Sequence, residues 1–223
     1  MSCRTDWYPP AVTASLPREI SLTGRVVRLD PLREADLPDL APILMDAAVY
    51  ASGYVMHRRP ATTEDALALG RSRFLAADAP NGAGFGRIAF AVRLAADSPL
   101  GAPGSLVGTT SLGDAHLANE SIHLGWTMYG SRWWGTAVNA ETKYLLLRHC
   151  FEDLGFGRVK LQTDRLNVRS TAAIAKLGAT REGVLRRETR REDGSFRDTV
   201  VFSLLADEWP AVAAGLQARF NAH

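Results

Sequence analysis

The stretch from Tyr129 to Leu154, YGSRWWGTAVNAETKYLLLRHCFEDL, constrains the fold more than any other part of the chain. A turn that contains Gly135 comes first, and apolar residues then follow at steps of three and four. This spacing places them on one face of a helix. They are Ala137, Ala140, Tyr144, Leu147, Phe151 and Leu154. Because the first N–H groups of a helix lack intrahelical partners, the turn before this helix predicts an anion-binding site.

The composition is that of an ordinary globular protein. The chain has 223 residues, of which 46% are hydrophobic and 22% are charged, and these values exclude a disordered or fibrous chain. This length supports one sizeable core. We therefore expect an N-terminal arm over residues 1–20 and a single domain over residues 21–223. The net charge of +2 gives no electrostatic case for a nucleic-acid partner.

Cysteine usage and hydropathy bear on the cellular setting. Cys3 and Cys150 lie far apart in the sequence, so neither a disulfide framework nor a metal site is predicted. Residues 1–20 lack the apolar core of a secretory signal, and no segment reaches the roughly twenty apolar residues of a membrane span. We expect a cytoplasmic protein without a metal and without a membrane partner.

The remaining patterns predict a mixed α/β chain. Strands are expected at residues 25–29, 87–94, 105–112, 121–128, 158–163, 182–192 and 196–205. Helices are expected at residues 33–45, from an N-cap at Thr63 to before Pro80, at 137–154, at 168–177 and from about Asp207. Residues 46–60 and the glycine-rich residues 81–86 are predicted as loops, and the Trp7-Tyr8-Pro9-Pro10 segment as part of the arm.

The strand predicted at residues 121–128 alternates between two kinds of side chain. Ile122, Leu124, Trp126 and Met128 would form an apolar face, and the residues between them a small or polar face. His123 belongs to the second face, which we expect to line a cleft.

Several motifs together resemble one family. Arg132-x-x-Gly135-x-Ala137 is similar to the acetyl-CoA pyrophosphate loop of the GNAT N-acetyltransferases, although a plain strand-to-helix turn would also place a glycine there. Asn167-x-x-Ser170, Leu177-Gly178-Ala179 and Glu182-Gly183 resemble the RimJ/RimL-like branch, as do Gly194, Asp198, Phe202 and the ending 204–209. The resemblance covers roughly residues 22–210. It implies the GNAT fold, an α/β (α+β) domain with a mixed, mostly antiparallel central sheet flanked by helices.

The resemblance also implies an acetyl-CoA site. Backbone N–H groups at the helix start would hold the pyrophosphate, with the Thr136 hydroxyl beside them, and the pantetheine arm would pair with the strand that ends at Met128. For Asn167, helix capping is the alternative interpretation. The expected cofactor-binding residues are Trp126, Thr127, Met128, Arg132, Trp134, Gly135, Thr136, Ala137 and Asn167.

Catalysis requires a base for the amine and a donor for the departing thiolate. His123 is the first candidate base and Glu120 the second. Family members often have an acidic residue where His123 stands, and an ordinary strand histidine is the alternative. Many relatives have a tyrosine where this chain has Ile174, so Ser170 is the candidate donor, with a plain first-turn helix residue as the alternative.

The acceptor side carries a weaker signal. Six arginines crowd the last predicted hairpin and would attract an acidic acceptor, although we favour a solvated face with cross-strand partners. They are Arg181, Arg186, Arg187, Arg190, Arg191 and Arg197. Tyr50, Tyr54, Met56 and His57 are expected on the opposite wall, while Trp133 and Trp134 are expected to pack on the sheet or on a partner subunit.

Two functions follow from these patterns. The first is direct transfer of acetyl from acetyl-CoA to a primary amine, which is a protein N-terminus, a lysine or a small molecule. The second is a non-catalytic coenzyme A-binding sensor or docking module. Homodimer formation is an expectation that comes only from the family resemblance.

Overall fold

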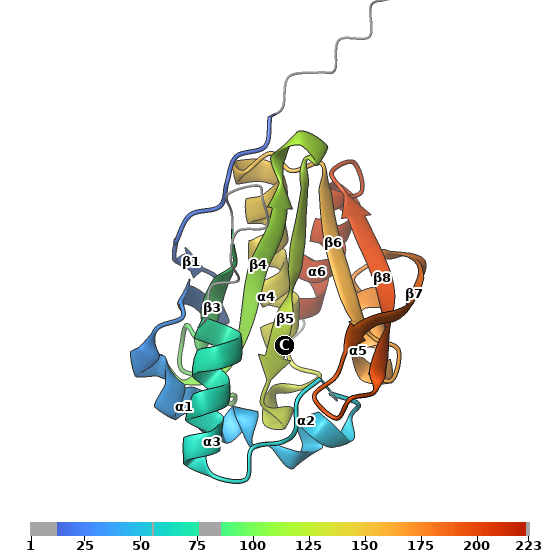
Figure 1. Cartoon of the computed structure of the whole chain (residues 1–223). Coiled ribbons are helices and arrows are strands. Elements are labelled where there is room, and N and C mark those ends of the chain that lie inside the picture. The colour runs from blue at the N-terminus through green and yellow to red at the C-terminus, as the bar shows by residue number, and fades with distance from the viewer. Residues whose placement is uncertain (1–12, 55, 76–85, 222–223) are drawn as a thin grey trace, which may run out of the picture.

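The computed structural model describes residues 13–54, 56–75 and 86–221. In these residues one eight-stranded sheet has the order β1-β2-β3-β4-β5-β6-β8-β7, as Figure 1 shows. Neighbouring strands are antiparallel, except that β5 and β6 are parallel. The predicted mixed, mostly antiparallel sheet is therefore confirmed.

The strands and helices follow the predicted order, with a short β1 and a short α2 added. The strands are β1 (Leu22–Thr23), β2 (Val27–Pro31), β3 (Ile88–Leu94), β4 (Leu106–His116), β5 (Ser121–Tyr129), β6 (Arg158–Asp164), β7 (Thr180–Arg190) and β8 (Phe196–Leu205). The helices are α1 (Leu37–Leu44), α2 (Ala47–Ala51), α3 (Thr63–Leu69), α4 (Ala137–Arg148), α5 (Val168–Ala175) and α6 (Trp209–Asn221). Wider π-helical turns extend α3 through Leu75 and α4 through Asp153.

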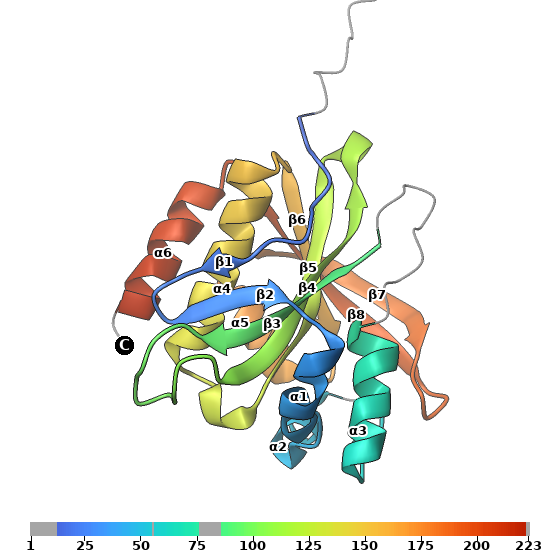
Figure 2. The same ribbon diagram turned by 90° about the vertical axis from the view of Figure 1, so that its left-hand side faces the viewer.

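Helices cover both faces of the sheet. Figure 2 shows α4 and α6 side by side on one face and α1, α2 and α3 gathered at the other. The larger core cluster lies on the α4 side, and the smaller one joins α1 and α3 to the sheet. Because α6 covers the outer side of α4, even Glu141 and Lys143 of α4 are buried. The simple amphipathic helix predicted for this segment is therefore wrong on its outer side.

Two local predictions need correction. The predicted loop at residues 46–60 contains α2, because the Asp46 side chain accepts a hydrogen bond from Ala48 N and caps the helix. Helix α3 is capped by Thr62, one residue before the predicted Thr63, through a reciprocal capping box with Asp65. The predictions for residues 7–10 and 81–85 lie outside the described residues.

Strand β5 contains a bulge at the position that matters most for the site. Trp126 has a φ of 50°, and Trp126 and Thr127 together stand opposite a single β4 residue. The strict alternation predicted for this strand is therefore wrong from Trp126 onward. The side chain of Thr127 reaches α4, whereas the Trp126 ring packs on His123 at the opposite face.

Strands β5 and β6 separate just before this bulge. Their parallel pairing covers only Ser121 to His123 on β5, while β6 goes on pairing with β8 as far as Asp164. The two strands diverge toward the start of α4 in Figure 1. The bulged half of β5 thus has a backbone edge without a partner strand among the described residues.

Candidate active site

The turn before α4 presents unpaired backbone donors. Gly135 has a φ of 76°, which favours glycine, and the Thr136 hydroxyl caps the helix by accepting from Val138 N. Within the described residues, no hydrogen bond engages the N–H groups of Gly135, Thr136 or Ala137. A Cβ added at Gly135 would meet no atom within 4 Å, so the turn faces open space. These features fit a bound pyrophosphate.

The tryptophans and arginines beside this turn are held by contacts within the fold. Trp134 Nε1 donates to the Tyr129 carbonyl at 3.1 Å, and Trp133 Nε1 donates to the Leu100 carbonyl at 3.1 Å. Arg132, a predicted cofactor residue, stacks on Trp133 at 4.6 Å. Both indoles thus pack on the domain, as predicted, and Arg132 lies beside the turn.

The start of α5 lies beside the same turn. The Arg169 guanidinium lies 3.8 Å from the centre of the Trp134 ring. Asn167 Oδ1 accepts from Ser170 N at 2.9 Å, so the capping role of Asn167 is confirmed. The half-buried Ser170 hydroxyl has no partner within the described residues. The structure therefore brings both predicted α5 residues to the end of α4 where the anion site lies.

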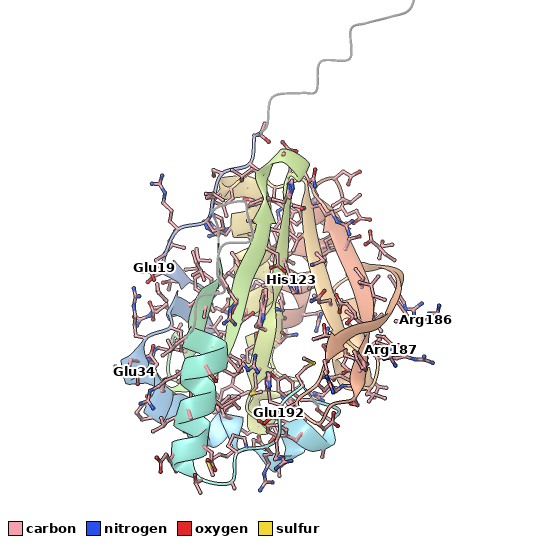
Figure 3. The ribbon with its side chains drawn as sticks, viewed as in Figure 1. Glu19, Glu34, His123, Arg186, Arg187 and Glu192 are labelled. Carbon is pink, nitrogen blue, oxygen red and sulfur yellow. The ribbon has the colours of Figure 1, made fainter. Side chains whose placement is uncertain are left out.

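His123 is buried beside the point where β5 and β6 separate. Its ring is 3% exposed and lies 4.5 Å from the Trp126 ring, and its Nδ1 lies 3.2 Å from Asp114 Oδ2. Nε2 is buried without a hydrogen-bond partner among the described groups. Figure 3 shows His123 near the middle of the sheet.

The surroundings of His123 set its protonation. Burial lowers its pKa, and this effect outweighs the hydrogen bond to Asp114, which acts in the opposite direction. The imidazole is therefore neutral at pH 7. Because the Asp114 carboxylate accepts from Nδ1–H, the lone pair is left on Nε2. A neutral, oriented imidazole with an unpaired Nε2 is equipped to take a proton.

Glu120 does not share this environment. It lies just before β5, at the end of the strand opposite to the bulge, and its carboxylate accepts from Thr13 N at 2.9 Å and Thr13 Oγ1 at 3.2 Å. Its carbonyl accepts from Gly157 N and Arg158 N. These contacts attach the N-terminal segment to the sheet, and the geometry does not support Glu120 as the base.

The hairpin arginines do not form one patch. Arg191 makes a buried ion pair with Asp164 at 2.8 Å, and its exposed fraction is 9%. Figure 3 shows Arg186 and Arg187 projecting away from the molecule, far from the labelled His123. Arg187 stacks on Phe196 at 4.0 Å. The interpretation of this hairpin as a structural, solvated face is the one that these contacts favour.

Two residues of this region were missed by the sequence analysis. Asp114 lies beyond the predicted end of its strand, which continues to His116. Lys143 is buried under the bulge, where its ammonium donates to Thr127 Oγ1 at 2.9 Å and to Thr110 Oγ1 at 3.5 Å. A signal for Asp114 was its two-residue spacing from Leu112, which continues the strand pattern, whereas nothing in the spacing of Lys143 separated it from a surface lysine.

Comparison with known proteins defines the family. The acetyltransferase (GNAT) domain model matches residues 27–180. The chain belongs to the GNAT acetyltransferase family. This membership implies acetyl-CoA as the acetyl donor and leaves the acceptor open. Curated proteins gave no significant match.

Solved GNAT structures resemble the chain over nearly its whole length. A T. thermophilus protein, described by inference as an acetyltransferase, is 37% identical with a TM-score of 0.74, covering 92% of this chain and 98% of that one. A GCN5-related N-acetyltransferase from Brucella melitensis is 25% identical with a TM-score of 0.77, covering 93% and 88%. Mycobacterium smegmatis RimJ, solved with CoA-disulfide, is 20% identical with a TM-score of 0.62, covering 90% and 93%, and this likeness shows the fold alone.

The described part of the chain contains no helix of the length and apolar character that crossing a membrane requires.

Substitution of Gly135 by valine is expected to weaken coenzyme A binding about tenfold, because the side chain would enter the anion site and strain a backbone with positive φ. Titration calorimetry with coenzyme A measures this loss. Gly104→Val is the matched control, because Gly104 also has a positive φ and open space around its Cβ position but lies in the β3–β4 loop. Equal affinities for the two variants would place the anion elsewhere.

Proposed function

We propose that this GNAT protein is a RimJ/RimL-like N-acetyltransferase that transfers acetyl from acetyl-CoA to a primary amine by direct attack. The observation that carries the proposal is the neutral, buried His123, oriented by Asp114 and with a free Nε2 beside the divergence of β5 and β6. Cys150 is buried inside the helical segment and its pKa is raised by burial, which disfavours a covalent route through a cysteine.

The acetyl donor fits the two backbone features of the site. The open N–H groups from Gly135 to Ala137 suit its pyrophosphate, and the unpaired edge of β5 at Trp126, Thr127 and Met128 suits its extended pantetheine arm. Backbone N–H groups along that edge would stabilise negative charge on the thioester oxygen. Acetyl-CoA supplies an activated acyl group whose thiolate is a good leaving group.

The residues of the chain then manage two proton positions. The amine nitrogen bonds to the thioester carbonyl carbon while the carbon–sulfur bond breaks, and His123 Nε2 takes the proton that the nitrogen loses. The Ser170 hydroxyl donates a hydrogen bond to the departing thiolate. The products are the acetylated amine and free coenzyme A, and His123 returns its proton to solvent or to the thiolate.

Ser170→Ala is expected to lower kcat about three- to tenfold with coenzyme A affinity unchanged, because one hydrogen bond to an anion is lost where full protonation is not required. Thiol release under saturating acetyl-CoA measures the change. Thr171→Val is the control, since the Thr171 hydroxyl is already bonded to the Asn167 carbonyl. A loss equal to that of the control would remove Ser170 from the mechanism.

Release of free thiol from acetyl-CoA across a panel of amines and peptides tests the whole proposal. Turnover with an amine supports it. Coenzyme A binding without turnover on any acceptor would instead favour the non-catalytic sensor or docking module, which is the alternative suggested by the buried Ile174 at the position where many relatives have a tyrosine. Absence of coenzyme A binding would exclude both.

A further inference from the structure

A cavity of about 610 Å³ lies between α3, the loop at residues 57–61 and the end of β7. Its lining includes His57, Arg58, Arg59, Arg73 and Glu192. A volume of this size is typical of sites for small molecules. The cavity is on the α3 side of the sheet, the face toward which His123 and Trp126 turn.

The cavity offers unpaired positive charge. Among the described residues, the guanidinium groups of Arg58, Arg59 and Arg73 have no hydrogen-bond or ion-pair partner. The two carboxylates of the lining are engaged, because Glu192 Oε2 accepts from Arg58 N at 2.7 Å and Asp65 Oδ2 accepts from Thr62 N at 3.1 Å. Planar guanidinium groups without partners are suited to a carboxylate or a phosphate.

Direct contacts connect this cavity with the candidate base. Arg87 Nη2 donates to the Arg73 carbonyl at 2.6 Å, and the Arg87 guanidinium lies 5.2 Å from the centre of the Trp126 ring. The Trp126 ring in turn lies 4.5 Å from the His123 ring. The wall that carries Arg73 therefore continues, residue by residue, to the base.

The segment that contains α2 bounds this side of the site. Asp46 Oδ2 accepts from Ser131 N at 2.7 Å after the end of β5, Gly53 packs on the Leu166 carbonyl after β6, and Arg58 N donates to Glu192 after β7. Figure 1 shows α2 and the following loop passing below the ends of these strands. A side bounded in this way favours a compact acceptor over a polypeptide laid across the surface.

We infer that the acceptor is a small amine that also carries a carboxylate or phosphate group. Arg59 and Arg73 bind this anionic group in the cavity, and the amine extends toward His123. The inference rests on the proposed function and adds the class of acceptor to it. His57 supports it, because burial and the nearby Arg73 charge lower the pKa of His57, which is consistent with a cavity whose positive charge is unpaired.

Matched amines test this inference. Acetyl transfer is measured as thiol release with 4-aminobutyrate against n-butylamine, and with O-phosphoethanolamine against ethanolamine. At least one anionic amine is expected to exceed its neutral counterpart in kcat/KM by about tenfold or more. The two pairs separate a carboxylate from a phosphate as the preferred group.

Variants locate the effect. The double variant Arg59→Gln, Arg73→Gln is expected to raise KM for the anionic amine about tenfold, with kcat, the rate on the neutral amine and coenzyme A affinity little changed. Arg186→Gln is the matched control, because this arginine projects outward from β7. A KM effect restricted to the anionic amine is not expected from a merely structural role.

Equal or lower kcat/KM for the anionic amines overturns the inference while leaving the proposed acetyltransferase function intact. Where no probe is acetylated, NMR titration with 4-aminobutyrate and with inorganic phosphate gives an independent measurement. Backbone shifts at residues 57–61 that disappear in the double variant support the cavity as an anion site, and absence of these shifts overturns it. Failure of the proposed function has a different signature, which is the absence of thiol release with coenzyme A still bound.

Discussion

Replacement of His123 by glutamine is expected to lower kcat about 10²–10³-fold at neutral pH, with coenzyme A affinity unchanged. Glutamine retains a polar side chain of similar reach that still contacts Asp114, but it cannot take a proton. The loss arises because His123 is the candidate base whose Nε2 is buried without a partner among the described residues. Steady-state thiol release with the best acceptor of the amine panel measures the change.

The pH dependence gives a second readout for His123. Burial lowers the pKa of His123 below its usual 6.5, so the imidazole is neutral and active at pH 7 and becomes protonated only at lower pH. The ratio of wild-type to His123→Gln rates is therefore expected to be constant above pH 6.5 and to fall as the pH drops through the lowered pKa. This ratio cancels the titration of the acceptor amine, which both proteins share.

His116→Gln provides the matched control, because His116 is an exposed histidine at the end of β4. Its rate and pH profile are expected to equal those of the wild type. If His123→Gln retains activity within about threefold of wild type, or if the ratio of rates does not change with pH, the base lies elsewhere and the capacity of the site to activate an amine needs another source.

Elements with a strong local backbone signal were predictable from the sequence. Asp193-Gly194 forms the predicted hairpin turn, and Gly178, with a φ of 91°, stands where the short helix α5 was expected to stop. The turn before α4 was predictable for the same reason, since Gly135 adopts a positive φ that few other residues tolerate. In each case the residues that determine the conformation are neighbours in the sequence.

Features that depend on distant parts of the chain were not predictable. The bulge at Trp126 is a mismatch between β5 and β4, so the sequence of β5 alone could only predict regular alternation. The outer side of α4 is buried by α6, which begins more than sixty residues later. The partner of His123 depends on the register of β4, and the link from Arg73 to Trp126 depends on three separate segments.

The buried Lys143 illustrates the same limit and leads to a large expected change in stability. Its ammonium is 5% exposed and contacts only the hydroxyl groups of Thr110 and Thr127. Glu141, two residues earlier, is also buried, but its carboxylate accepts three backbone N–H bonds from residues 25–27. Lys143 has no carboxylate partner among the described residues, so burial lowers its pKa from 10.5 to about 7.

This depressed pKa opposes folding over a defined pH range. The unfolded chain binds the Lys143 proton up to pH 10.5, whereas the folded chain releases it near pH 7. The cost is therefore complete below pH 7, decreases between pH 7 and 10.5, and is absent above that range. A shift of one unit corresponds to about 1.4 kcal/mol, so the full cost is on the order of 4 kcal/mol.

Lys143→Met is expected to raise the free energy of unfolding by about 2–4 kcal/mol at pH 6, because methionine occupies the same buried space without a charge. The hydroxyl groups that Lys143 contacts remain bonded to each other at 2.8 Å, so the substitution leaves no new unpaired polar group there. Denaturant unfolding at pH 6 and pH 9 measures the difference. The gap between variant and wild type should narrow by roughly 2–3 kcal/mol at pH 9, as the wild type loses the buried charge.

Lys176→Met makes the same chemical change at an exposed position on the turn after α5. Its free energy of unfolding should follow that of the wild type within about 0.5 kcal/mol at both pH values. A Lys143→Met protein that is no more stable than this control at pH 6, or whose advantage is the same at pH 9, would mean that the ammonium reaches water or an anionic partner in the folded state. The bulge of β5 would then stand over a solvated charge, and the packing of α4 beneath the acetyl site would differ from the arrangement described above.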